Sequence, residues 1–176
     1  QEIEAKAVLA ESKSGQILLL EGEMGMGAST VMDHMAYQLA EQGRFRLLRG
    51  DFLDLAGAET GLRQALEGYL GCHGLSRHEM KDLIGGHLQR HGANTESEFE
   101  ALLDFLRPSR EGVAFAEGNQ NAVFALFFRT LRRIAAERPV YLALSEIHHG
   151  GDLCIAFLEY AIFEWTDAPC PILICA

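Results

Sequence analysis

Residues 17–30 read Ile-Leu-Leu-Leu-Glu-Gly-Glu-Met-Gly-Met-Gly-Ala-Ser-Thr, and this stretch decides the fold. The apolar run at its start, followed at once by turn-forming residues, is typical of a buried strand and predicts one over 17–21. Gly22, Gly25 and Gly27 then make a glycine-rich loop. A helix is expected from Ser29 to Gln42, because Gly43 supplies a stop signal directly after it.

The loop matches the pattern of a phosphate-binding loop, G-x-x-x-x-G-K-[ST], except at its lysine. Gly22 and Gly27 hold the glycine positions and Ser29 holds the hydroxyl position, but Ala28 stands where lysine belongs. Backbone amides and the helix dipole can still hold an anion there. The ammonium group that would neutralise the β- and γ-phosphates is missing. The residues expected to contact a nucleotide are Gly22, Gly25, Gly27, Ala28, Ser29 and Thr30.

Strands and helices alternate along the chain, which predicts an α/β fold with a mainly parallel sheet. A first helix over 1–12 has Ile3, Ala7 and Val8 on its apolar face. Further helices are expected over 59–70, 119–137 and 152–165, and further strands over 45–48, 140–144 and 171–175. The expected fold class is the three-layer P-loop NTPase fold, formed by residues 1–176 as a single domain.

Residues 71–118 differ in composition from the rest, because several glycines divide them into short segments before Pro108. They lie between the second and third strands, so we interpret them as a helical insertion within the domain. Helices are expected over 77–91 and 95–106. In the second, one apolar face is formed by Phe99, Leu102, Leu103 and Leu106, which should point inward.

A second motif follows the apolar run 140–144, which is suited to a central parallel strand. P-loop enzymes place an acidic residue at the end of such a strand for the magnesium ion, and a second acid to orient the attacking water. Ser145 occupies the first of these positions and Glu146 the second. Ser29 and Ser145 are therefore weak candidate magnesium ligands, and Glu146 is the candidate catalytic residue.

Together the two motifs resemble the nucleotide-binding domain of bacterial STAND-type ATPases, a branch of the AAA+ P-loop NTPases found in multidomain regulators. In that family the first motif commonly reads G-E-x-G-x-G-K-[ST], and here it reads Gly-Glu-Met-Gly-Met-Gly-Ala-Ser over 22–29. The second runs from R-P through D-D to H-W-x-D, and here it runs from Arg138-Pro139 through Ser145-Glu146 to His148 and Asp152. The resemblance covers most of the chain, least specifically the insertion.

The departures from the family pattern concern the residues that handle charge. Lysine is replaced by Ala28, the first aspartate by Ser145, and the aromatic residue after the histidine by His149. We interpret these losses as inherited rather than engineered. The resemblance also implies a fifth strand, a helical lid and a winged-helix module, which have no counterpart in this sequence. Without the fifth strand, family topology would place the strand before the loop at a sheet edge.

The composition sets broad limits on function. The 176 residues carry a formal net charge of -10, which argues against a nucleic-acid surface. No apolar run approaches the ~20 residues that span a bilayer, and no signal peptide is recognisable, so a cytoplasmic location is expected. The cysteines show no C-x-x-C pair and are expected to be reduced and partly buried. Because the first residue is Gln1, we expect a piece of a longer protein.

Several polar residues allow two interpretations. Ser29 and Thr30 can contact a nucleotide or cap the helix. Glu146 is a general base or a remnant of one. His148, His149 and Asp152 suggest a metal site, but adjacent residues point in different directions, which argues against it. The remaining polar clusters are expected at the surface: the histidines His73, His78, His87 and His91, and the basic residues Arg129, Arg132 and Arg133.

The function that these features favour is regulation rather than catalysis. We expect a degenerate ATPase-like module of a larger signalling protein, with weak or no binding of ATP or ADP with Mg²⁺ and little hydrolysis. Its expected partners are other domains of the same polypeptide or other proteins, and neither nucleic acid nor a membrane. An active but atypical ATPase and a nucleotide-independent interaction module are the alternatives.

Overall fold

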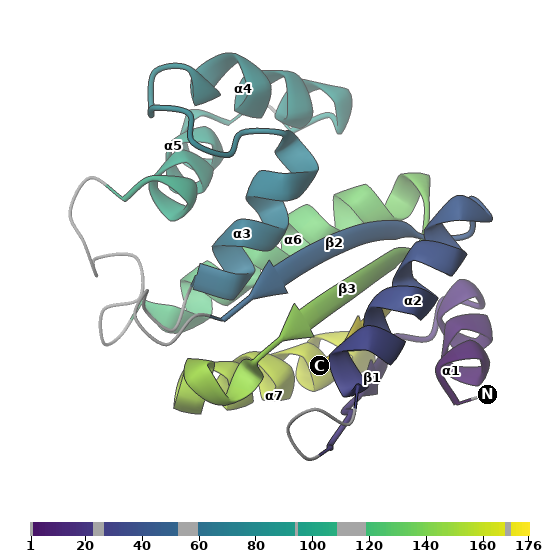
Figure 1. Ribbon diagram of the computed structural model, residues 1–176. Helices are drawn as coiled ribbons and strands as arrows, with labels where there is room; N and C mark the ends of the chain where they lie inside the picture. Colours follow the sequence, from purple (N-terminus) through teal and green to yellow (C-terminus); the bar gives the residue numbers. More distant parts are fainter. Residues whose placement is uncertain (1, 23–26, 53–59, 94, 109–118, 168–169) are drawn as a thin grey trace.

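The computed structural model describes residues 2–22, 27–52, 60–93, 95–108, 119–167 and 170–176 (Figure 1). Helices and strands alternate in these segments, as the sequence predicted, except that four consecutive helices lie between residues 60 and 137. The helices are α1 (Glu2–Glu11), α2 (Ala28–Glu41), α3 (Thr60–Leu70), α4 (Met80–Arg90), α5 (Glu96–Leu106), α6 (Gln120–Glu137) and α7 (Gly151–Asp167). The strands are β1 (Gln16–Leu18), β2 (Arg46–Asp51), β3 (Val140–Ser145) and β4 (Ile172–Cys175), and the 3₁₀-helix η1 (Ile147–Gly150) follows β3.

The described strands form one parallel sheet in the order β1-β4-β3-β2. β1, which leads into the glycine-rich loop, lies at an edge of this sheet, as expected. It is shorter than predicted: the regular register with β4 ends at Leu18 opposite Cys175, and Leu19 is 52% exposed. Beyond that point the Leu20 N–H still donates a hydrogen bond to the Ala176 carbonyl at 2.7 Å. β2 is longer than predicted, since its pairing with β3 continues to Asp51 opposite Ser145. Apolar character alone does not reveal where a partner strand ends.

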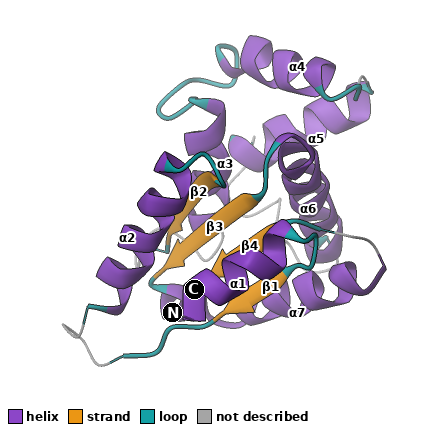
Figure 2. Ribbon diagram, turned by 90° about the vertical axis from the view of Figure 1, so that its right-hand side faces the viewer, coloured by secondary structure: helices purple, strands orange, loops and turns teal. Residues whose placement is uncertain are grey.

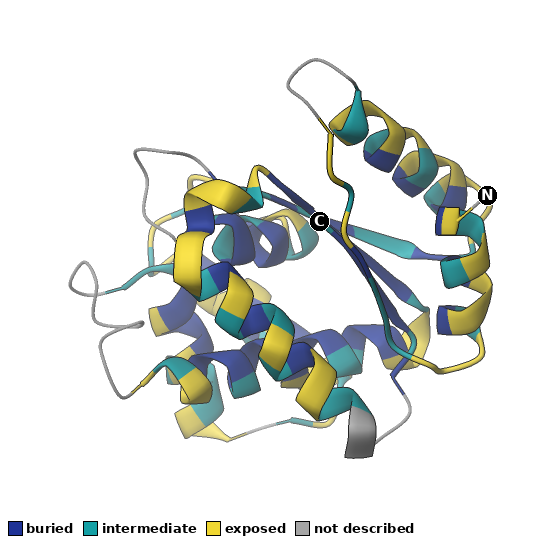
Figure 3. Ribbon diagram, turned by 90° about the horizontal axis from the view of Figure 1, so that it is seen from below, coloured by how far each residue is buried: buried dark blue, intermediate teal, exposed yellow. Residues whose placement is uncertain are grey.

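Helices cover both faces of the sheet and give three layers (Figure 2). Because side chains alternate along a strand, β3 contributes to both cores. Val140, Leu142 and Leu144 lie in the larger cluster, which holds residues of α3 to α7. Tyr141 and Ala143 lie in the smaller cluster, with residues of α1 and α2. Figure 3 shows the buried strands between helices whose outer sides are exposed.

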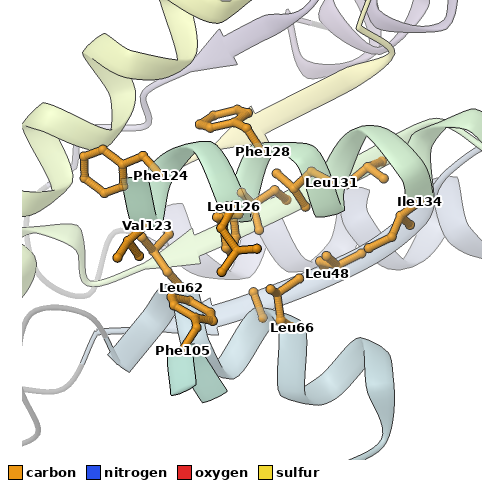
Figure 4. Packing of buried hydrophobic residues seen from close by; sticks show 14 of the residues in the cluster. Leu48, Leu62, Leu66, Phe105, Val123, Phe124, Leu126, Phe128, Leu131 and Ile134 are labelled. Atoms are coloured by element: carbon orange, nitrogen blue, oxygen red, sulfur yellow. The ribbon is translucent and has the colours of Figure 1, made fainter. Parts of the chain in front are cut away.

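The predicted core face of α6 is confirmed. Val123, Phe124, Phe127, Leu131 and Ile134 are all buried, and they pack against α3, α5 and β2 or against α7 (Figure 4). The first helix agrees less well with prediction. Ile3 and Ala7 are buried with Ala10, at spacings of four and three, but Val8 is 54% exposed because it lies beside that narrow stripe.

Both predicted helices between residues 71 and 108 are present as α4 and α5, beyond α3 on the β2 side of the sheet (Figure 1). Leu102, Leu103 and Leu106 are buried, and Phe99 is partly buried against them, as predicted. Phe105 is also buried, which the predicted face did not include. α5 packs against α3, α4 and α6, so this region is joined to the main core.

Two surface predictions in this region were wrong. His87 is fully buried rather than exposed, next to the rings of Tyr69 and His91. The side chain of His91, also predicted at the surface, is only 7% exposed. The basic residues of α6 do not form a simple solvated face. Arg133 donates two hydrogen bonds to Glu98 of α5, at 2.6 and 3.0 Å, and these bonds lower the pKa of the Glu98 carboxyl. The predicted exposure holds for Arg129, whose side chain is 54% exposed.

Candidate functional site

A cavity of about 840 Å³ opens at the carboxyl ends of β1, β3 and β4. Ligands of parallel α/β sheets commonly bind at this end of the strands. The cavity brings together most of the predicted site residues, from the glycine-rich loop, the start of α2 and the end of β3. Its lining includes Gly22, Gly27, Ala28, Ser29, Thr30, Ser145, Glu146, His148 and His149. Gly25 lies outside the described residues.

The start of α2 presents backbone amides to the cavity. Gly27 caps this helix in the left-handed conformation, with φ of 83°, which favours glycine over residues with a side chain. The helical ladder begins where Val31 N–H donates to the Gly27 carbonyl at 2.9 Å. The amides of Ala28, Ser29 and Thr30 precede that bond and have no partner within the helix, so they are available to an anion.

Of the two interpretations of Ser29 and Thr30, contact with a ligand or capping of α2, the structure does not support capping. The helix begins at Ala28, its cap is Gly27, and no side chain makes a capping hydrogen bond. Both hydroxyl residues therefore lie within the first turn, where they are exposed and line the cavity.

The end of β3 supplies the opposite wall. All of β3 is buried, as predicted for a central strand. Ser145 is 7% exposed, and its hydroxyl oxygen has no hydrogen-bond partner among the described residues. Glu146 follows with a positive φ of 57°, which is uncommon outside glycine and turns the chain out of the sheet. Its side chain is 52% exposed.

The described lining residues include no lysine or arginine. Arg49 of β2, outside this lining, is committed elsewhere: it pairs with Asp33 at 3.0 Å and with Asp51 at 3.7 Å. The residues present do not fit a magnesium–triphosphate group, because Mg²⁺ prefers several oxygen ligands. Ala28 cannot neutralise phosphate, and Ser145 cannot replace a carboxylate. We therefore derive no hydrolytic step at this cavity.

The prediction that His148 and His149 point in different directions was wrong. Their ring centroids are 4.0 Å apart, because the tight turn of η1 brings them to one side. Possible ligand atoms of Glu146, His148 and His149 all lie within 4.8 Å of one another. Asp152, which the sequence had grouped with the histidines, is not part of this cluster. The spacing E-x-H-H was the available signal, and the 3₁₀ turn that makes it effective was not predicted.

The cysteines are free and buried, in agreement with prediction: Cys72, Cys154, Cys170 and Cys175. Burial raises the pKa of the Cys154 thiol to about 12, so this thiol is protonated and unreactive at neutral pH.

Comparison of the chain with protein-family models, curated proteins and solved structures found no match. Every helix among the described residues is too short or too polar to cross a membrane. The class that the fold and cavity define is an α/β protein with a parallel sheet and a hollow at the carboxyl ends of its strands. Its function must be argued from the residues of that hollow.

Proposed function

We propose that this chain is a degenerate ATPase-like domain related to the STAND branch of AAA+ P-loop NTPases. It acts as a regulatory or scaffolding module of a larger signalling protein, with weak or no nucleotide binding and little or no hydrolysis. One observation carries this proposal. The cavity has the backbone of a phosphate site, at the start of α2, but Ala28 and Ser145 occupy the positions of its charged groups.

The sheet order supports the relationship to P-loop NTPases. The strand before the glycine-rich loop lies at the edge, and β4 separates it from the strand that carries Ser145 and Glu146. This is the order expected for the family without its fifth strand. The loop and the acidic strand end therefore face one cavity, although more than a hundred residues separate them in the chain.

Charge explains why we favour regulation over catalysis. A lost charge-assisted contact costs about 1.5–3 kcal/mol, which corresponds to roughly a tenfold to more than a hundredfold weaker binding. Phosphoryl transfer depends almost entirely on positioning and electrostatic stabilisation. Loss of both the phosphate cation and the metal carboxylate therefore removes most of the means of hydrolysis, while the amides of α2 can still bind a simple anion.

Steady-state ATPase measurements test this proposal. We expect no turnover above background for the unmodified chain, and little for Ala28→Lys, because magnesium would remain poorly held. Ala28→Lys/Ser145→Asp restores both charges and is the variant in which any recovery should occur. Steady turnover by the unmodified chain, abolished by Glu146→Gln, would contradict the proposal and favour an atypical ATPase.

A further inference from the structure

The cluster of Glu146, His148 and His149 has the dimensions of a metal site. Its possible ligand atoms lie within 4.8 Å of one another, and Glu146 Oε2 is 3.7 Å from His148 Nε2. An ion with bonds of about 2.0–2.2 Å holds neighbouring ligands roughly 3–4 Å apart. The separations in the cluster are therefore close to those that such an ion needs, and the three side chains are exposed.

The backbone beneath the cluster holds the turn in place. The His149 N–H donates to the Glu146 carbonyl at 3.0 Å, which closes the turn directly after β3. Gly150 is buried against Cys154 and Phe52, where an added Cβ would clash with the Cys154 sulfur. Glu146 keeps its positive φ in this setting. Unusual backbone conformations that packing enforces occur often at functional sites.

A second observation points to a ligand at the same place. Ser145 lines the same cavity as Glu146, His148 and His149, and only 7% of its surface is exposed. Its hydroxyl oxygen has no hydrogen-bond partner in the part of the chain that the structure describes. Buried hydroxyl groups are nearly always satisfied, so a small rotation of the Ser145 side chain toward a ligand in the cavity would satisfy this one.

We infer that Glu146, His148 and His149 bind a transition-metal ion of the zinc class. Two imidazoles and one carboxylate form a donor set that suits Zn²⁺ and leaves positions open for water or an anion. The same set suits Mg²⁺ poorly, because imidazole is not its preferred ligand. This site goes beyond the proposed function and does not depend on nucleotide binding.

The location of the ion adds one consequence, which rests on the proposed function. The cluster and the start of α2 line one cavity. A zinc-class cation there would lie in the same cavity as Ala28, Ser29 and Thr30, and would bring to it the positive charge that Ala28 lacks. Inorganic phosphate should then bind more tightly in the presence of Zn²⁺ than in the presence of Mg²⁺.

Calorimetric titration of the metal-free chain with Zn²⁺, in a buffer without phosphate, tests the metal site. We expect one zinc ion per chain, and His148→Ala/His149→Ala should weaken binding at least about tenfold, since even partners of metal ligands contribute that much. Glu146→Gln should weaken it in the same direction. His34→Ala/His78→Ala removes two exposed histidines outside the cluster and should leave the affinity unchanged. Circular dichroism checks that each variant is folded.

The outcomes separate the metal site from the proposed function. No zinc binding, or equal loss in the ligand and control variants, overturns the metal site. Titration with phosphate is then repeated with and without Zn²⁺. Zinc binding that depends on His148 and His149, without any binding of phosphate, upholds the metal site and contradicts only the predicted effect of zinc on phosphate binding. The proposed function is tested separately by the ATPase measurements.

Discussion

His87 shows how one residue can decide the response of this chain to pH. It is fully buried in α4, and neither ring nitrogen has a hydrogen-bond partner among the described residues. Burial is the largest cause that lowers its pKa, to about 4, and nearby cations add to the effect. The charged and titratable groups around it include Tyr69, Arg90, His91, Glu98, Arg133 and Glu137.

The sign of the resulting pH dependence follows from linkage. The unfolded chain binds a proton at His87 below about pH 6.5, whereas the folded chain does so only below about pH 4. Between these values the unfolded state binds more protons, so stability falls as the pH is lowered. Through His87, the free energy of unfolding therefore falls by roughly 3 kcal/mol as the pH is lowered from 6.5 to about 4.

We therefore predict that His87→Leu reduces the acid sensitivity of folding. Urea unfolding at pH 7 and at pH 4.5 measures the free energy of unfolding, and the loss between these conditions should be about 2–3 kcal/mol smaller in the variant. His78→Gln changes an exposed histidine of the same region and serves as the control. The same loss in His87→Leu and in the unmodified chain would show that His87 is accessible to protons in the folded state.

At the scale of elements, α5 connects the region before residue 108 to the main core. Its buried leucines lie in one cluster with residues of α3 and α6, and its Glu98 receives both hydrogen bonds from Arg133. Burial on one face and an ion pair to α6 argue that α5 folds together with the sheet.

Replacement of one buried leucine on α5 by alanine tests this connection. Leu103 is fully buried, so Leu103→Ala should lower the free energy of unfolding by about 2–5 kcal/mol. The control is Leu83→Ala on α4, where the side chain is 38% exposed and the cost should be well below that of Leu103→Ala. Amides of residues 96–106 should also exchange slowly with solvent. Equal effects of the two variants, with rapid exchange throughout 96–106, would mean that α5 is not packed.

The sequence predicted elements well where the apolar pattern is strong, as in the periodic face of α6 and the continuous apolar run of β3. The prediction failed where the structure depends on contacts with residues far away in the sequence. The end of β1 depends on where β4 ends, and burial of His87 depends on Tyr69 and the helices around it. The candidate site shows the same division. Gly27, Ala28 and Ser145 were predicted from local motifs, whereas the approach of His148 to His149 requires the positive φ of Glu146 and the 3₁₀ turn after it.

At the scale of the whole molecule, the parallel sheet places the start of α2 and the end of β3 around one cavity. In the function that we propose, a phosphate group would bind in this cavity, whose described side chains include no lysine or arginine.

Calorimetric titration of the metal-free chain with ATP and ADP, with and without Mg²⁺, tests the central claim most directly. We predict weak binding or none, because the amides of α2 act without a lysine. Mg²⁺ should change the affinity little, since Ser145 offers no carboxylate. Tight binding of ATP that requires Mg²⁺ would contradict the account, and would mean that a cation outside the described lining of the cavity replaces the missing lysine.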